Sequence, residues 1–244
     1  MFNLLAKFDL RDNWTPPTNI LQERYIVSAA WMELGESEVH AVSVLDNPKL
    51  YKKDPHNDRH VVETLHRELS TADLIIAHNG DKFDLRWLNG RILFHGLPPL
   101  PPMQTLDTYK VAKRVFELNS YRLDYLGQYL KVGGKATTPK GLWLDVLRGD
   151  IEAIKTMVQY NKRDVELLKE VYLKVRGFAP SHFNSQLITD EGDHCPRCQS
   201  LRIQSRGERT TLTQVYRRFQ CLDCGGWFRA RAAIKNRATT HRVG

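Results

Sequence analysis

The order of hydrophobic and polar residues in the first half of the chain predicts a series of strands and helices. Two runs rich in β-branched and aromatic residues flank a polar turn, which predicts a β-hairpin over residues 25–45. Val62, Leu65 and Leu69 follow at helical spacing. The next run, over residues 74–77, is short and continuously apolar, which is typical of a strand buried on both faces of a sheet.

The second half of the pattern is mainly helical. Helical spacing resumes over residues 83–94 and is followed by a proline-rich loop. A brief strand then leads into a helix that begins at Asp107 or Thr108. Residues 120–130 place three leucines on one helical face, and residues 149–175 are periodic enough for one helix or two successive helices. This order of elements favours an α/β fold, with a mixed sheet flanked by helices.

The periodic pattern ends near residue 176. Residues 176–193 contain glycine, proline, serine and asparagine without helical or strand spacing, which indicates a linker. At 244 residues the chain is long enough for one substantial core and a small additional module. We therefore expect an α/β domain over residues 1–178, a linker over 179–191, a small module over 192–232 and a basic tail over 233–244.

Positive charge is concentrated at the end of the chain. The net charge is +8, and the residues from Cys195 onward carry 11 lysines and arginines against two acids. That segment therefore has a balance of +9, which leaves the preceding residues at −1. A basic module on a near-neutral body suggests nucleic acid as a partner, and a solvated basic tail is the alternative. No apolar run approaches the length of a membrane span and no signal peptide is apparent, so we expect an intracellular, cytoplasmic protein.

All four cysteines lie in this basic module, as two C-x-x-C pairs. They are Cys195, Cys198, Cys221 and Cys224, with 22 residues between the pairs. Each pair can turn two thiolates toward one ion, and two pairs complete the tetrahedron that structural Zn²⁺ prefers. Two disulfides or a redox pair are weaker alternatives, because neither a secretion signal nor a thioredoxin-like βαβ context is present. The arrangement resembles a zinc ribbon.

Arginines and aromatic residues alternate around the second cysteine pair. Arginine next to an exposed ring suits phosphate contact combined with base stacking, so we predict that Arg217, Arg218 and Arg229 bind nucleic acid. The neighbouring aromatic residues are Tyr216, Phe219, Trp227 and Phe228. They could instead form the small core of the module, and we favour that role for Phe219.

Three acidic residues of the larger domain occupy positions at which catalytic or ligand-binding residues are often found. Asp84 follows a predicted strand and a polar turn, at the strand end where α/β sheets usually bind ligands. Asp164 follows Tyr160 by four residues, which puts both side chains on one helical face. Asp107 lies at a strand-to-helix junction, where we favour a role as helix N-cap. Asp84 could instead be a negative charge that stabilises the N-terminus of a helix. Tyr160 and Asp164 could be an exposed pair on the surface of a helix.

Taken together, these residues carry a family resemblance. H-N-G-x-x-F-D at residues 78–84, followed by Y-x-x-x-D at residues 160–164, resembles two motifs of the DEDDy 3′–5′ exonucleases. These enzymes form part of the DnaQ-like group of the ribonuclease H-like fold. Residues 25–175 as a whole are similar to the predicted 3′–5′ exonuclease and YprB-like members of that fold.

The resemblance implies a metal-dependent 3′–5′ exonuclease that acts on DNA or RNA by a two-metal mechanism. Asp84 and Asp164 would be ligands of Mg²⁺ or Mn²⁺, and Tyr160 would orient the attacking water. His78 and Asn79 would shape the turn and contact the substrate rather than bind metal. The zinc ribbon would hold the nucleic acid.

The D-x-E motif that these exonucleases carry on their first strand is missing or altered. In one interpretation Asp9 is its aspartate and Arg11 replaces the glutamate, which would put a cation into a divalent-metal site. In the interpretation that we favour, residues 1–20 correspond to the segment after the motif, and Met1 lies just downstream of the strand. The alternative function is a nucleic-acid-binding protein that keeps the fold but has an impaired metal site.

Overall fold

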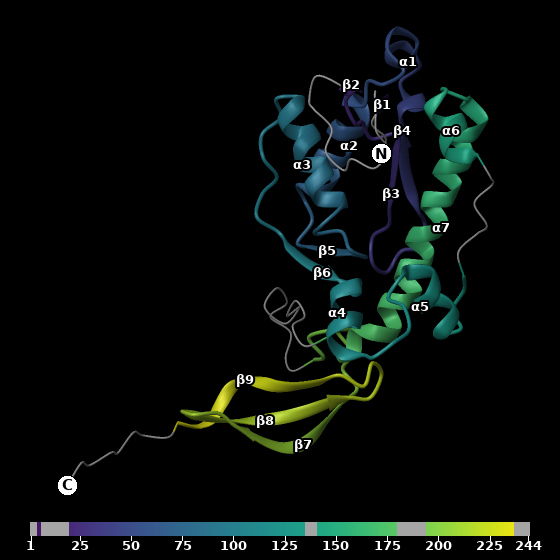
Figure 1. Ribbon diagram of the computed structural model, residues 1–244. Helices are drawn as coiled ribbons and strands as arrows, with labels where there is room; N and C mark the ends of the chain where they lie inside the picture. Colours follow the sequence, from purple (N-terminus) through teal and green to yellow (C-terminus); the bar gives the residue numbers. More distant parts are fainter. Residues whose placement is uncertain (1–3, 6–19, 135–140, 180–193, 237–244) are drawn as a thin grey trace.

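The computed structural model describes residues 4–5, 20–134, 141–179 and 194–236 (Figure 1). The predictions made for Met1, Asp9 and Arg11 lie outside these residues. The first six described strands are β1 (Leu4–Leu5), β2 (Ile20–Gln22), β3 (Ser28–Trp31), β4 (His40–Ser43), β5 (Leu74–Ala77) and β6 (Gln104–Asp107). The last three are β7 (Ile203–Thr210), β8 (Gln214–Cys221) and β9 (Trp227–Asn236).

Helices separate most of the early strands and then dominate the middle of the chain. The α-helices are α1 (Pro48–Lys53), α2 (Arg59–Leu69), α3 (Asp84–Phe94), α4 (Thr108–Val115), α5 (Leu123–Tyr129), α6 (Leu142–Leu147) and α7 (Ile151–Val175). The described part of the chain also contains the short 3₁₀ helices η2 (Val44–Asp46) and η3 (Arg176–Phe178). The expected α/β fold is therefore confirmed. Across the described residues, no helix combines the length and the apolar character that crossing a membrane requires.

The strands pair as small separate sheets. β3 and β4 form the predicted antiparallel hairpin, in a register that runs from Ser28 opposite Ser43 to Trp31 opposite His40. β5 and β6 form a parallel pair in which Ala77 lies beside Asp107. β1 pairs with β2, and β7, β8 and β9 form one antiparallel sheet. One continuous mixed sheet is thus not formed by the described strands.

The structure corrects one prediction about a strand and decides an open alternative about a helix. The strand over residues 74–77 was predicted to be buried on both faces, but each of its residues is only half-buried. The reason is that β6 is the one strand that pairs with β5 among the described residues. The long periodic segment forms one helix, α7, whose first turn is capped by Asp150 through a 2.8 Å hydrogen bond from the Ala153 amide.

Helix α7 organises the interior of the larger domain. Its first half packs with the hairpin, α2, α3 and α6 around the main apolar core. Its second half packs with α4 and α5 around a second cluster. At 1.5 Å per residue, 25 residues extend for about 37 Å. Figure 1 shows this helix running from α6 at one end to α5 and α4 at the other.

A buried ion cluster joins α2 to α3. Asp58 is completely buried, and its carboxylate accepts two hydrogen bonds from the Arg91 guanidinium, at 2.7 and 2.8 Å. The same carboxylate accepts the Ile26 amide at 2.8 Å and the His95 ring Nε2–H at 2.7 Å. It therefore fixes the ends of two helices and the segment before β3 at one point.

Replacing Asp58 with alanine is expected to lower the free energy of unfolding by about 3–5 kcal/mol, because Arg91 would stay buried without its partner. Chemical denaturation followed by circular dichroism measures the change. Asp145→Ala serves as the matched control, since Asp145 is half-buried and its ion pair with Arg148 lies at the surface. Equal stability of the two variants would show that the cluster contributes nothing.

Candidate active site and cysteine cluster

A tight turn after β5 places Asp84 at the start of α3. Asn79 has φ +63°, a left-handed conformation that asparagine tolerates better than most residues. Gly80 packs so closely that a Cβ at this position would lie 2.4 Å from the Ala77 Cβ. The Gly80 carbonyl then accepts the Leu85 amide at 3.0 Å as the helix begins. The backbone that this turn requires therefore explains the asparagine and the glycine of the H-N-G sequence.

Asp107 holds the same turn from the neighbouring strand. Its Oδ1 accepts the backbone amides of Tyr109 at 3.0 Å and Lys110 at 3.4 Å, which confirms the predicted N-cap of α4. The same oxygen accepts the Asn79 amide at 2.8 Å. Its other carboxylate oxygen, Oδ2, is buried and has no hydrogen-bond partner among the described residues. Asp107 thus links the ends of β5 and β6, a role beyond capping that the sequence did not indicate.

Both ring nitrogens of His78 face protein atoms. Nδ1 lies 2.9 Å from the Thr108 hydroxyl, and Nε2 lies 2.9 Å from the Tyr121 carbonyl oxygen. Burial lowers the pKa of His78, although the Tyr121 carbonyl and the charge of Asp107 oppose this decrease. In this conformation His78 fastens the end of β5 to α4 and offers no free nitrogen to a metal ion. That His78 shapes the turn and contacts the substrate rather than binding metal stays a prediction.

Asp84 and Asp164 line the same large cavity, whose volume is about 1690 Å³. Asp84 comes from α3 and Asp164 from α7, 80 residues apart in the sequence. Asp84 keeps access to solvent, yet desolvation by the surrounding protein raises the pKa of its carboxyl. The negative charge of Asp107 adds to this increase, and a backbone hydrogen bond opposes it. A bound cation would relieve this cost by favouring the ionised carboxylate.

Tyr160 is placed differently from Asp164. Its side chain is buried, and it is not among the described residues that line the cavity. Asn161, which the sequence analysis missed, does line the cavity, and its Nδ2–H donates to the Ser28 hydroxyl at 2.8 Å. This bond ties α7 to β3. Its position three residues before Asp164 on one helical face was the available signal.

The donor set around the cavity meets part of the requirement for divalent cations. Carboxylate oxygens are the ligands that Mg²⁺ and Mn²⁺ prefer, so Asp84 and Asp164 suit such an ion. Among the described residues, however, only the cysteines bring three or more ionisable ligands close enough to share one ion. The described residues therefore do not bring together a carboxylate set for two divalent ions.

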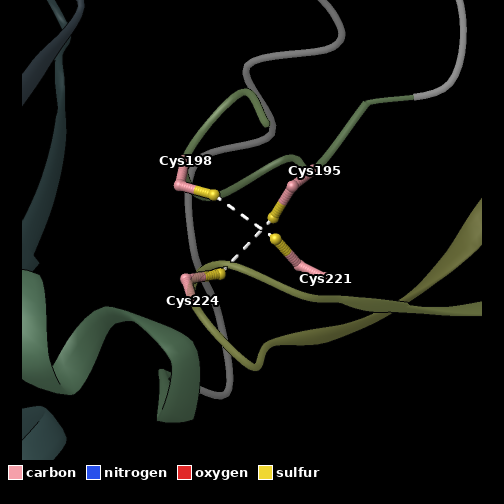
Figure 2. A group of neighbouring side chains, drawn as sticks. All are labelled: Cys195, Cys198, Cys221 and Cys224. Carbon is pink, nitrogen blue, oxygen red and sulfur yellow. Dashed lines mark hydrogen bonds between the residues drawn. The ribbon is translucent and has the colours of Figure 1, made fainter. Parts of the chain in front are cut away.

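The four cysteines converge as their spacing predicts (Figure 2). Their sulfurs lie within 4.8 Å of one another, and the Cys195–Cys224 and Cys198–Cys221 pairs are each separated by 3.6 Å. A disulfide would need about 2.05 Å. Four sulfurs placed tetrahedrally around Zn²⁺ at about 2.3 Å would be about 3.8 Å apart. The geometry therefore fits a zinc ion and excludes disulfides in this conformation.

The thiols differ in how readily they ionise. Burial raises the pKa of Cys195 strongly and that of Cys198 to about 11. Burial also opposes ionisation of Cys221, but hydrogen bonds from the Cys224 and Asp223 amides outweigh it and lower the pKa to about 7. At neutral pH, zinc must therefore displace protons from Cys195 and Cys198.

The cysteine cluster packs against the end of α7. Arg197 donates to the carbonyl oxygens of Gly177 and Ala179, at 2.9 Å each. Gly226 approaches Arg197 so closely that a Cβ would lie 2.3 Å from Nη1, and one on Gly177 would lie 2.1 Å from the Cys224 carbonyl oxygen. Figure 1 shows the three-stranded sheet of β7, β8 and β9 next to α4 and the end of α7, where these contacts are made.

The sheet formed by β7, β8 and β9 combines a small aromatic core with exposed arginines. Phe219 is buried, as we favoured. The Arg229 guanidinium lies 4.0 Å from the centre of the Tyr216 ring, and that of Arg218 lies 5.0 Å from the centre of the Trp227 ring. Such stacking orders the cations while leaving them accessible. The three arginines predicted to bind nucleic acid, Arg217, Arg218 and Arg229, are all exposed.

Comparison with known proteins gives one result for the larger domain. A search of curated proteins found no match to this chain. A family model described as the RNase_H superfamily matches residues 32–176, which is more than half of the chain. The matched region begins directly after β3, extends past the end of α7 and includes Asp84 and Asp164. The chain therefore belongs to the RNase_H superfamily.

Proposed function

We propose that this protein hydrolyses phosphodiester bonds of DNA or RNA from the 3′ end and depends on divalent cations. The observation that carries the proposal is that Asp84 and Asp164, from two distant helices, line one cavity. Members of the RNase_H superfamily are usually nucleases, which agrees with this arrangement. The direction of cleavage rests on the H-N-G-x-x-F-D and Y-x-x-x-D motifs.

Some residues of this chain would bind the cation, and others would keep the cation ligands in position. When bound, a divalent cation would polarise the scissile phosphate and lower the pKa of an attacking water. Asp84 and Asp164 would hold the cation, while Asp107 and His78 keep the turn before Asp84 in place. Tyr160 lies buried one turn before Asp164, so orienting a water would require its side chain to rotate toward the cavity.

The test uses single-stranded DNA and RNA labelled at the 5′ end, incubated with the protein in Mn²⁺ or Mg²⁺. We expect a ladder of labelled products that shorten progressively from the 3′ end. The same strands with a blocked 3′ end should resist cleavage. Binding without any cleavage in either metal ion would contradict the proposal and favour a nucleic-acid-binding protein that lacks catalysis.

We also propose that the exposed arginines of β8 and β9 hold the nucleic acid. The double variant Arg218→Ala/Arg229→Ala is expected to bind single strands more weakly at low salt. The slope of log K against log salt concentration should decrease by about 2, because two phosphate contacts are lost. Fluorescence anisotropy with a labelled oligonucleotide measures both quantities. Arg67→Ala, which removes an exposed arginine on α2, should leave them unchanged.

A further inference from the structure

The sheet of β7, β8 and β9 carries different side chains on its two faces. Phe219 of β8 lies opposite Phe228 of β9, and their rings stack with 5.5 Å between the ring centres. Phe219 is buried, so this pair belongs to the apolar face. Arg218 lies opposite Arg229 in the same register. Because successive residues of a strand point to opposite faces, the two arginines project from the other face.

Two aromatic rings share this second face with the arginines. The Arg218 guanidinium contacts the Trp227 ring, and the Arg229 guanidinium contacts the Tyr216 ring, so each ring lies beside a cation. The rings differ in their exposure, because Trp227 is 46 % exposed and Tyr216 only 8 %. Trp227 therefore has ring surface on which a planar ligand can stack, whereas Tyr216 is covered. We call the face formed by Tyr216, Arg218, Trp227 and Arg229 the stacking face.

The positive charge of the stacking face is not balanced within the sheet. Like charges directly opposite each other on neighbouring strands destabilise a sheet, and Arg218 and Arg229 are such a pair. Within the described strands β7, β8 and β9 the one acidic residue is Glu208, which lies opposite Arg217. Arg218 donates to the Arg206 carbonyl oxygen at 2.9 and 3.1 Å, which orients the guanidinium without neutralising it. A phosphate bound between Arg218 and Arg229 would remove their repulsion.

We propose that the stacking face selects single-stranded nucleic acid, with one base stacked on Trp227 and a neighbouring phosphate between Arg218 and Arg229. The bases of a duplex stack on one another, so their faces are closed to a protein ring, whereas a single strand can turn a base outward. Every base has a π-face, so this contact tolerates any sequence.

The inference rests on the proposed role of the arginines in holding nucleic acid, and it adds the strandedness of the ligand and a contact with a base. It does not depend on hydrolysis, because binding is measured without the ions that cleavage requires.

The experiment uses the full chain prepared with zinc, in buffer without Mg²⁺ or Mn²⁺, and three fluorescent probes. They are a 12-nucleotide single strand, the same strand annealed to its complement, and a strand of 12 abasic units, which keeps the phosphates but has no bases. Fluorescence anisotropy measures each Kd. We expect the single strand to bind about tenfold more tightly than the abasic strand, because one stacked base contributes a factor of this order. It should also bind more tightly than the duplex.

Two substitutions of Trp227 separate stacking from packing. Trp227→Leu keeps an apolar side chain without a π-face and should lose the tenfold advantage, while the Kd for the abasic strand and the salt dependence stay unchanged. Trp227→Tyr should keep most of the advantage. Tyr129→Ala is the matched control, since it removes a ring of α5 that is 59 % exposed, and it should change none of the three affinities.

Equal affinity of the original protein for the single strand and the abasic strand would overturn the proposal, and this comparison needs no variant to fold. Binding of the duplex as tightly as the single strand would overturn the selectivity. If Arg218→Ala/Arg229→Ala lowers the salt slope but Trp227→Leu changes nothing, the arginines hold nucleic acid and the stacking contact is refuted. If the arginine variant also has no effect, the proposed role of the arginines fails as well.

Discussion

Replacing Asp164 with asparagine is expected to reduce nucleic-acid hydrolysis by roughly 10²–10³-fold. Electrostatic stabilisation by a bound cation contributes several kcal/mol to the transition state, and each 1.4 kcal/mol corresponds to a tenfold change in rate. Asparagine keeps the shape of the side chain but removes the charge that would hold the cation. Single-turnover cleavage of the labelled strands in Mn²⁺ measures the effect. Unchanged activity in this variant would refute the assigned site.

Asp84→Asn should lose activity to a similar extent without losing stability. The pKa of Asp84 is raised in the folded protein, so its ionised form disfavours folding at neutral pH. This cost is absent well below pH 4, where the carboxyl is protonated in both states, and it appears as the pH rises through the folded-state pKa. Because Asp84 is exposed, the gain on removing the charge is small, and the melting temperature should be unchanged or slightly higher.

Asp145→Asn is the matched control for both substitutions. Asp145 lies on α6, pairs with Arg148 at the surface and is not among the described residues that line the cavity. Its activity should equal that of the original protein. A comparable loss in all three variants would indicate a general effect of charge on substrate binding rather than a metal site.

Removing zinc is expected to unfold the sheet of β7, β8 and β9 while α7 and the main core persist. Among the described residues from His194 onward, the buried apolar side chains are Cys195, Tyr216, Phe219 and Cys221. This core is too small to stabilise a module of about 40 residues without a covalent or metal link. Structural zinc sites contribute about 10–16 kcal/mol of apparent free energy at neutral pH.

The measurement combines metal analysis with two-dimensional NMR before and after treatment with a strong chelator. One zinc per chain is expected, and signals of β8 should collapse to random-coil positions when it is removed. Cys195→Ser should behave like the metal-free protein, whereas Ser205→Ala, on the exposed face of β7, should keep its zinc. A folded sheet without zinc would disprove the structural role of the metal.

The affinity for zinc should decrease as the pH falls. The pKa of Cys198 is about 11 and that of Cys195 is raised further by burial, so these thiols hold their protons in the absence of metal. Protons therefore compete with the ion more strongly at lower pH. Competition with a zinc indicator at pH 6 and pH 8 measures the difference, and an affinity independent of pH would contradict it.

Local rules in the sequence were sufficient where only near neighbours matter. The C-x-x-C spacing predicted the cysteine cluster because each pair forms within one turn of backbone. The N-cap at Asp107 was predictable because a cap needs only the amides two or three residues ahead. The motif residues around Asp84 were also identified, since a strand followed by H-N-G and a helix start is a continuous segment.

The same rules were less successful for surfaces that depend on distant parts of the chain. Residues 74–77 were predicted to be buried because they are apolar, but their exposure depends on whether a neighbouring strand is present. Tyr160 and Asp164 were assigned to one helical face. Residues four apart differ by about 40° around a helix, which was enough to bury Tyr160 while Asp164 lines the cavity.

By itself, the sequence determined the α/β class, most helices and strands, the four thiols and the residue types of the candidate site. Only the tertiary structure decided that Asp84 and Asp164 line one cavity, that Asp107 holds the turn before Asp84, and that the residues of β3 and β5 line the same cavity. The reason is physical. Capping, turns and helical spacing act within a few residues, whereas cavities and sheet edges result from how distant segments pack against each other.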